Sequence, residues 1–85
     1  MAMSDRQEIR TFIEQRLRQK GDSKPCGDGE SLILSGRLQS IDAVEIVMFL
    51  ESRFGLDFAS IGFDQAEIDS IEKIHALAIA HIPVR

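Results

Sequence analysis

The sequence predicts an all-α fold: a small four-helix bundle of three longer helices and one short helix, with a long loop between the first two. Apolar residues recur at helical spacing in three segments, and helix start or stop signals flank these segments. Four of the six glycines fall between the first two segments. Because 85 residues provide one limited core, we expect a single domain over residues 1–85.

The first helix is expected over residues 5–20. Ser4 stands where the N-cap belongs, and Gln7 completes the spacing of a capping box. Gly21 is the stop signal. One apolar stripe follows the helical period and comprises Ile9, Phe12, Ile13 and Leu17. The basic side chains of this helix are interpreted as a solvated face rather than a binding site.

Residues 21–39 predict a long loop, because they contain four glycines and Pro25. Leu32, Ile33 and Leu34 are expected to anchor the middle of this loop to the core. A loop of this length is unusual in a small domain and tends to be functional, whereas the simpler alternative is a spacer between helices.

The second helix is expected over residues 40–54, with Ser40 as its N-cap and Gly55 as its C-cap. A helical wheel places on its core side Ala43, Val44, Ile46, Val47, Leu50 and Phe54. The opposite side is expected to face solvent and is marked by Asp42, Glu45, Ser52 and Arg53. Asp42 and Glu45 also place negative charge in the first turns, which the helix dipole favours.

Apolar side chains interrupt this solvent-facing side. Phe49 projects between Asp42 and Glu45, and Ile41 and Met48 lie at the margin. Apolar groups among acids are typical of a docking surface, and flexible methionine suits a surface that meets several partners. The alternative is that a neighbouring loop or helix covers Phe49 and Met48 and makes them part of the core.

The remaining residues predict a short helix at 64–68 and a final longer helix. Asp69 and Glu72 have the spacing of an N-terminal cap pair for the final helix, and Pro83 ends it. The apolar face of the final helix comprises Ile71, Ile74, Leu77, Ala78 and Ile82. Ordinary core, rather than the lining of an apolar channel, is the interpretation for Phe63, Ile68 and Ile71.

The net charge of −4 is unevenly distributed. Residues 1–20 carry five basic and three acidic side chains, a net charge of +2, whereas residues 21–85 carry five and eleven, a net charge of −6. Affinity for nucleic acid comes largely from neutralising phosphates, so this acidic balance argues against a nucleic-acid partner. It favours protein partners with basic docking patches.

Several further classes of protein are not expected. No run of eighteen apolar residues could span a membrane, and the N-terminus lacks the apolar core of a signal peptide. Cys26 is the only cysteine and lies in a polar loop, so we expect it to be exposed and the protein to be cytoplasmic. His75 and His81 lack a metal-ligand spacing, so no metal is predicted. With no nucleophile–base pair, metal cluster or phosphate loop in the sequence, we do not expect an enzyme.

The start of the second helix carries a resemblance to a known family. The segment Leu38-Gln39-Ser40-Ile41-Asp42-Ala43-Val44-Glu45, followed by Val47-Met48, Leu50-Glu51 and Phe54-Gly55-Leu56, resembles the acyl carrier protein family. The match extends from about Ser4 to Ile82. In that family a serine in an Asp-Ser-Leu type motif carries 4′-phosphopantetheine, and Ser40 matches this serine. The sequence departs from the family at Gln39, where Asp is most common.

The resemblance implies a non-catalytic, monomeric acyl carrier protein. A phosphopantetheinyl transferase would attach 4′-phosphopantetheine from coenzyme A to Ser40. The arm would hold acyl intermediates as thioesters for the loading and processing enzymes of fatty acid, polyketide or related lipid biosynthesis. Three residues match positions of the partner-recognition helix in the family: Glu45, Met48 and Glu51. The predicted partner surface as a whole comprises Ile41, Asp42, Glu45, Met48, Phe49 and Glu51.

Three alternatives bear on this interpretation. Asp69-Ser70-Ile71 looks like a second copy of the motif, but helix capping explains it, and in the family the modified serine precedes the long second helix. An aminoacyl or peptidyl carrier for a stand-alone adenylating ligase stays open, because the sequence does not decide the cargo. An unmodified helical interaction module that keeps the fold also stays open, because of Gln39.

Overall fold

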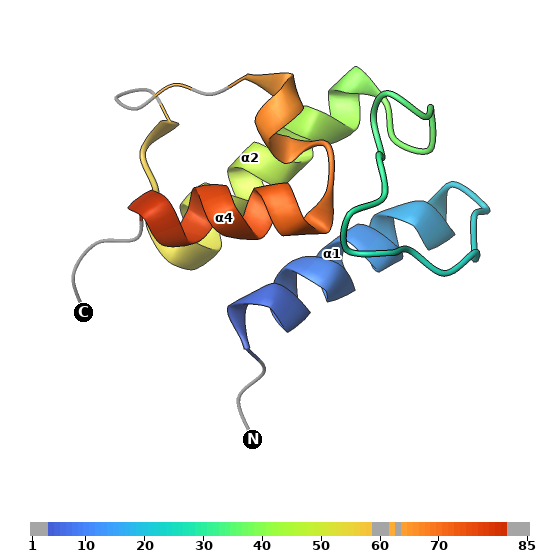
Figure 1. Cartoon of the computed structure of the whole chain (residues 1–85), viewed down its shortest axis with the longest axis horizontal. Helices are drawn as coiled ribbons and strands as arrows, with labels where there is room; N and C mark the ends of the chain where they lie inside the picture. The colour runs from blue at the N-terminus through green and yellow to red at the C-terminus, as the bar shows by residue number, and fades with distance from the viewer. Residues whose placement is uncertain (1–3, 59–61, 63, 82–85) are drawn as a thin grey trace.

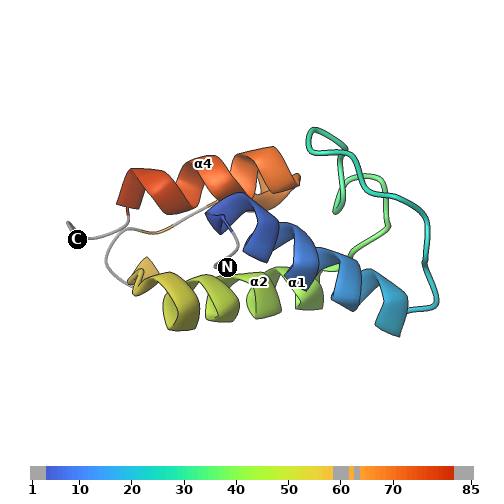
Figure 2. The same ribbon diagram turned by 90° about the horizontal axis from the view of Figure 1, so that it is seen from below.

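The computed structural model describes residues 4–58, 62 and 64–81, and these residues form helices and loops without a strand. The elements are α1 (Asp5–Gln19), α2 (Ser40–Phe54), η1 (Gln65–Ile68) and α4 (Ile71–His81). The all-α prediction is confirmed, and the expected short helix is a single 3-10 turn, η1. Figure 1 gives the arrangement of these elements, and Figure 2 shows α4 and α2 on opposite sides of the view with α1 running across the near side of the bundle.

Local signals set both ends of α1 and the C-terminal end of α2, as the sequence predicts. At the start of α1 the Oγ of Ser4 accepts the backbone N–H of Gln7 at 3.2 Å. Gly21 and Gly55 follow the two helices with φ angles of 85° and 71°. Both angles lie in the left-handed region, where a side chain would be strained, so glycine lets the chain turn away at each position.

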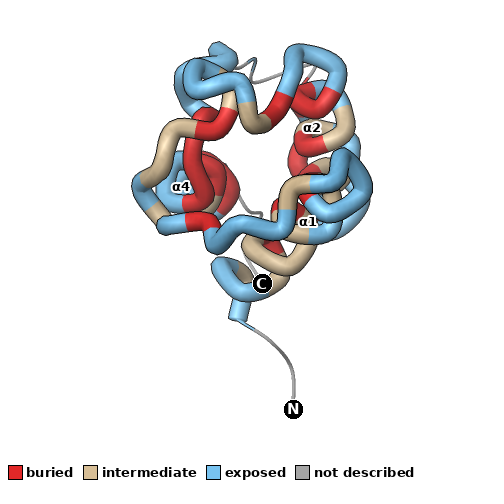
Figure 3. Tube along the Cα trace, turned by 90° about the vertical axis from the view of Figure 1, so that its right-hand side faces the viewer, coloured by how far each residue is buried: buried red, intermediate tan, exposed pale blue. Residues whose placement is uncertain are grey.

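One apolar core lies between the helices, and Figure 3 shows the buried stretches of chain facing this interior. The buried residues of α1 are Ile9, Ile13 and Leu17, and the buried apolar residues of α2 are Ala43, Ile46, Leu50 and Phe54. Those of α4 are Ile71, Ile74, Leu77 and Ala78. Each fully buried large apolar side chain contributes about 1.5–3 kcal/mol, so these three stripes supply most of the favourable free energy of folding.

Two predictions of burial were wrong. Val44 was expected in the core but is 52% exposed, because the side of α2 that packs inward is the one carrying Ile46 and Leu50. Leu34 was expected to anchor the long loop but is 85% exposed. It lies in a turn whose preceding residue Leu32 enters the core, so the turn leaves Leu34 outside.

Three basic side chains of α1, which were interpreted as part of a solvated face, bind groups elsewhere in the chain: Arg6, Arg10 and Arg16. Arg6 Nη1 lies 2.9 Å from Asp28 Oδ2, and Arg10 pairs with the same carboxylate. Arg10 also donates to the carbonyl oxygen of Cys26 at 2.5 Å. These contacts draw the long loop onto α1. Cys26 is therefore buried rather than exposed, and burial raises the pKa of its thiol.

Arg37 closes the long loop on itself. Its guanidinium donates to Asp22 at 2.9 and 3.1 Å, to Glu30 at 2.6 Å, and to the carbonyl oxygens of Lys24 and Pro25. These hydrogen bonds lower the pKa of Asp22 and of Glu30. A guanidinium presents five donors in a fixed geometry, so one side chain can organise a whole loop. The long loop is therefore held together by its own hydrogen bonds and leads directly into α2.

Asp69 fixes the other half of the loop. Its carboxylate accepts the hydroxyl of Ser31 at 2.6 Å and the backbone N–H groups of Ile33 and Leu34 at 2.7 and 3.0 Å. Its carbonyl oxygen accepts the N–H of Leu32 at 2.7 Å. Asp69 is itself buried, so these bonds replace the water that the carboxylate loses on folding.

The predicted cap pair of α4 was therefore wrong. The cap is Ser70, whose Oγ accepts the N–H of Lys73 at 3.1 Å, because Asp69 is committed to the loop. Glu72 does not complete a cap pair through its side chain; its backbone N–H donates to the carbonyl oxygen of Asp28 at 2.8 Å. The start of α4 thus binds both halves of the long loop.

We expect the free energy of unfolding to fall at acid pH, in part through Asp69. Burial alone would raise the pKa of Asp69, but hydrogen bonds from Ser31, Leu34 and Ile33 outweigh it and lower the pKa. The stabilisation is complete above the unfolded pKa of about 3.9 and is lost as the pH falls through the lower folded value. Urea unfolding at a series of pH values from neutral to acid measures this loss of free energy of unfolding.

The matched variants are Asp69→Asn and Asp64→Asn. Asp69→Asn should cost about 1–3 kcal/mol at neutral pH, because buried donors lose their charged acceptor, and the cost should shrink at acid pH. Asp64 is exposed and caps η1, where Asn serves equally well, so its variant should resemble the wild type. A constant difference between wild type and Asp69→Asn at every pH contradicts the assignment.

Candidate functional site

The candidate site is the start of α2, where Ser40 is the first helical residue and is exposed. Its hydroxyl makes no hydrogen bond to any residue that the structure describes. The predicted N-cap was wrong by one position, because Gln39 is the N-cap and its N–H donates to Asp42 Oδ2 at 2.8 Å. Asp42 thus takes the capping role expected of Ser40, and the hydroxyl of Ser40 is left uncommitted.

Asp42 itself was placed on the wrong side of the helix by the sequence analysis. It was expected to face solvent and to contact partners, but it is only 1% exposed. Arg16 Nη2 lies 2.7 Å from its Oδ1, and Lys20 Nζ lies 2.9 Å from its Oδ2. Burial alone would raise the pKa of Asp42, but the N–H of Gln39 and the two cations outweigh it and lower the pKa. A carboxylate held in this way is not available to a partner.

Phe49 is also removed from the predicted docking surface. Its ring stacks on Phe12 of α1 with centroids 4.3 Å apart and planes at 9°, and it meets Phe54 edge-on at 6.0 Å. α1 therefore covers Phe49, which packs against the core and is partly buried. A neighbouring helix therefore covers Phe49, as the alternative interpretation proposed, but Met48 stays exposed.

Three apolar side chains remain exposed on α2 and define the apolar strip: Ile41, Val44 and Met48. They are 61%, 52% and 57% exposed and are spaced by three and four residues, so they share one face of the helix. The strip begins one residue after Ser40. Glu45 and Glu51 are half-buried, and Glu51 accepts the backbone N–H of Phe58 at 3.3 Å.

The other residues singled out by the sequence lie away from this site. Ser70 is buried and caps α4, and Ile68 and Ile71 are fully buried core residues, as expected. His75 lies within 3.5 Å of Arg6, and among the described residues no group of His, Cys, Asp and Glu could hold a metal ion. The predictions for Phe63, Ile82 and Pro83 concern positions outside the described residues.

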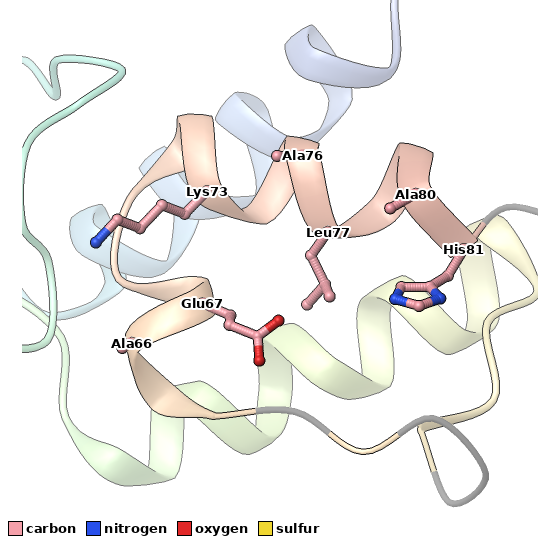
Figure 4. A pocket seen from close by; sticks show the side chains of 7 residues that line it. All are labelled: Ala66, Glu67, Lys73, Ala76, Leu77, Ala80 and His81. Atoms are coloured by element: carbon pink, nitrogen blue, oxygen red, sulfur yellow. The ribbon is translucent and has the colours of Figure 1, made fainter.

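Two hollows on the surface lie near η1 rather than at Ser40. The larger, of about 420 Å³, runs between η1 and α4, with Leu77 in its apolar wall and Lys73 and His81 toward its ends (Figure 4). The smaller, of about 240 Å³, lies between η1 and the loop residues Ile33 and Leu34. None of the residues that line either hollow belongs to α2.

Comparison of the chain with protein-family models, with curated proteins and with solved structures gives no match. None of the described helices is both long enough and apolar enough to cross a membrane. The feature of α2 that bears on function is the exposed hydroxyl of Ser40 beside the exposed apolar strip.

We expect Phe49→Ala to lower the free energy of unfolding by about 1–3 kcal/mol, because it removes a ring packed against the core. A double-mutant cycle with Phe12→Ala should give a coupling energy of about 0.5–1.5 kcal/mol for the stacked pair. Met48→Ala is the matched control on the exposed side and should stay within about 0.5 kcal/mol of wild type. Urea unfolding of the wild type and the four variants measures these free energies. A large cost for Met48→Ala with none for Phe49→Ala would reverse the two assignments.

Proposed function

We propose that the protein is an acyl carrier protein that bears 4′-phosphopantetheine on Ser40. The observation that carries the proposal is an exposed serine hydroxyl without an internal partner at the first residue of an apolar helix. Its sequence setting resembles the modified serine of carrier proteins. The ordered long loop before α2 and the all-helical bundle agree with the four-helix architecture of that family.

The chemistry of attachment has a physical reason to use this position. The product is a phosphodiester, which is a permanent anion. The first turn of a helix offers backbone N–H donors without intrahelical partners and the positive end of the helix dipole, and both stabilise an anion. The transferase and its metal ion perform the reaction, so Ser40 needs accessibility rather than a neighbouring base. The carrier is not itself an enzyme.

The proposed partner surface is the apolar strip together with Glu45. The strip supplies apolar contact area next to Ser40, and Glu45 lies between Val44 and Met48 in the sequence. Residues 21–85 carry a net charge of −6, which favours encounter with basic docking patches on a transferase and on acyl-loading and acyl-processing enzymes. Asp42 and Phe49 are left out of the proposed surface because they are engaged within the fold.

The proposed cargo is an acyl intermediate of fatty acid, polyketide or related lipid biosynthesis, carried in the cytoplasm. An aminoacyl cargo delivered by a stand-alone adenylating ligase is separated from it by loading the modified protein with candidate ligases. A second function is favoured by one residue: Gln39, which stands where carrier proteins most often have Asp, suits an interaction module that no longer receives the arm. Both functions would use the apolar strip.

We expect the intact mass to rise by one phosphopantetheine arm after incubation with coenzyme A and a phosphopantetheinyl transferase. Ser40→Ala should abolish the increase, because it removes the accepting hydroxyl. Ser70→Ala should keep it, although loss of the α4 cap should lower the free energy of unfolding by about 1 kcal/mol. Mass spectrometry of the intact proteins reads out all three.

The variant Gln39→Asp separates the two functions. If the wild type and Gln39→Asp both gain the arm, the protein is a carrier. If only Gln39→Asp gains it, Gln39 blocks modification and the interaction module becomes the better description. If neither gains it with several transferases, attachment at Ser40 is wrong.

We expect Met48→Ala and Glu45→Lys to raise the KM of the transferase for this protein about 10-fold or more, because they alter the surface that the enzyme docks on. The matched control is Ile79→Ala, which removes a similarly exposed apolar side chain from α4. Steady-state kinetics and thermal melts of the three variants test the surface together. An equal KM for all three, or a large loss of stability in Met48→Ala, would place docking elsewhere.

A further inference from the structure

We propose that Arg16, Lys20 and Asp42 act as positioning residues for the modification of Ser40, and this role rests on the proposed carrier function. The three side chains, called the clamp here, join the end of α1 to the start of α2. Sequence patterns did not predict these contacts, because the paired residues are at least 22 positions apart in the chain.

Within the clamp, Arg16 and Lys20 bind different oxygens of the Asp42 carboxylate. Oδ1 lies 2.7 Å from Arg16 Nη2, and Oδ2 lies 2.9 Å from Lys20 Nζ. Oδ2 also accepts the backbone N–H of Gln39 at 2.8 Å. Asp42 therefore connects α1 to the residue immediately before Ser40, while its own backbone lies two residues after Ser40. The backbone of Ser40 is held on both sides.

Burial keeps the Asp42 carboxylate bound to its protein partners. Asp42 is 1% exposed, so its carboxylate cannot exchange its protein partners for water without moving the first turn of α2. Hydrogen bonds between ionised groups are stronger and geometrically stricter than neutral ones. The hydroxyl of Ser40 gains a fixed backbone in this way while it stays exposed itself. A fixed nucleophile reacts faster, because less orientation has to be achieved during the reaction.

The clamp also corrects the charge beside the hydroxyl. A lone carboxylate in the first turn would repel the phosphates of coenzyme A. Arg16 and Lys20 together bring two positive charges to one negative charge, so the cluster is not anionic. Asp42 is buried and therefore cannot contact the transferase. Clamp variants should for that reason change kcat for arm transfer, whereas variants of the exposed apolar strip should change KM.

A second ion pair joins the same two helices and provides the matched control. Arg53 Nη2 of α2 lies 2.6 Å from Glu8 Oε1 of α1, at the ends of the helices opposite to Ser40. The Arg53–Glu8 pair is more exposed than the clamp, so folding of each variant is checked before modification is compared. If the clamp positions Ser40, only the pair at the start of α2 should matter.

The experiment compares wild type, Asp42→Asn, Lys20→Gln and Arg53→Gln at a temperature where each is folded. We expect Asp42→Asn to lower kcat for arm transfer by about 10-fold or more with KM within about twofold of wild type. Lys20 is at the rim of the clamp, so Lys20→Gln should fold readily and lower kcat by a smaller factor. Arg53→Gln should leave kcat unchanged.

Amide hydrogen exchange provides a readout that does not depend on modification. The hydrogen-bonded amides of this turn are those of Gln39, Asp42 and Ala43. Their protection should decrease in Asp42→Asn and persist in Arg53→Gln. Unchanged kcat in both clamp variants, or an equal decrease in Arg53→Gln, overturns the positioning role while the carrier function stands. A wild type that never gains the arm defeats the carrier function and the positioning role with it. Unchanged protection in Asp42→Asn defeats the clamp whatever the kinetics.

Discussion

Ion pairing of basic side chains of α1, and of Lys20 just after it, with carboxylates elsewhere in the chain fixes where the long loop and the start of α2 lie. The apolar core of 85 residues is small, and burial of apolar surface has no preferred direction. Burial alone therefore does not decide where a long loop lies. Arg6 and Arg10 bind Asp28 and hold the loop against α1, while Arg16 and Lys20 bind Asp42 and hold the start of α2.

These anchors divide α2 into regions with different tasks. One side is buried against the other helices, the first turn is tied to α1 by Asp42, and Phe49 is covered by Phe12. The remaining face carries the apolar strip, which begins one residue after Ser40. A protein that binds the strip would be adjacent to the hydroxyl. The Ser40 hydroxyl and the apolar strip can therefore serve attachment and docking on one small surface, because neither is part of the core.

Carrier function and interaction function would place the same demands on this surface. Both need exposed apolar area, a rigid helix and an acidic balance that attracts basic partners. They differ only in whether a transferase accepts Ser40 with Gln39 before it. The geometry of the first turn is compatible with attachment, because Asp42 supplies the cap and leaves the Ser40 hydroxyl exposed. The same fold thus suits both functions, and only the modification of Ser40 distinguishes them.

Local patterns in the amino-acid sequence were enough to predict the all-helical fold, the bounds of α2 and the stops at Gly21 and Gly55. These features depend on the spacing of apolar residues and on backbone conformations that glycine alone adopts readily, and both are local properties. The burial of Asp42 and the exposure of Val44, by contrast, depend on contacts between segments that are distant in the chain. A helical wheel ranks the sides of a helix by polarity, but which side faces inward depends on partners distant in the chain. A carboxylate can be buried when Arg16 and Lys20 meet it there, and such a meeting of charges leaves no periodic signal in the sequence.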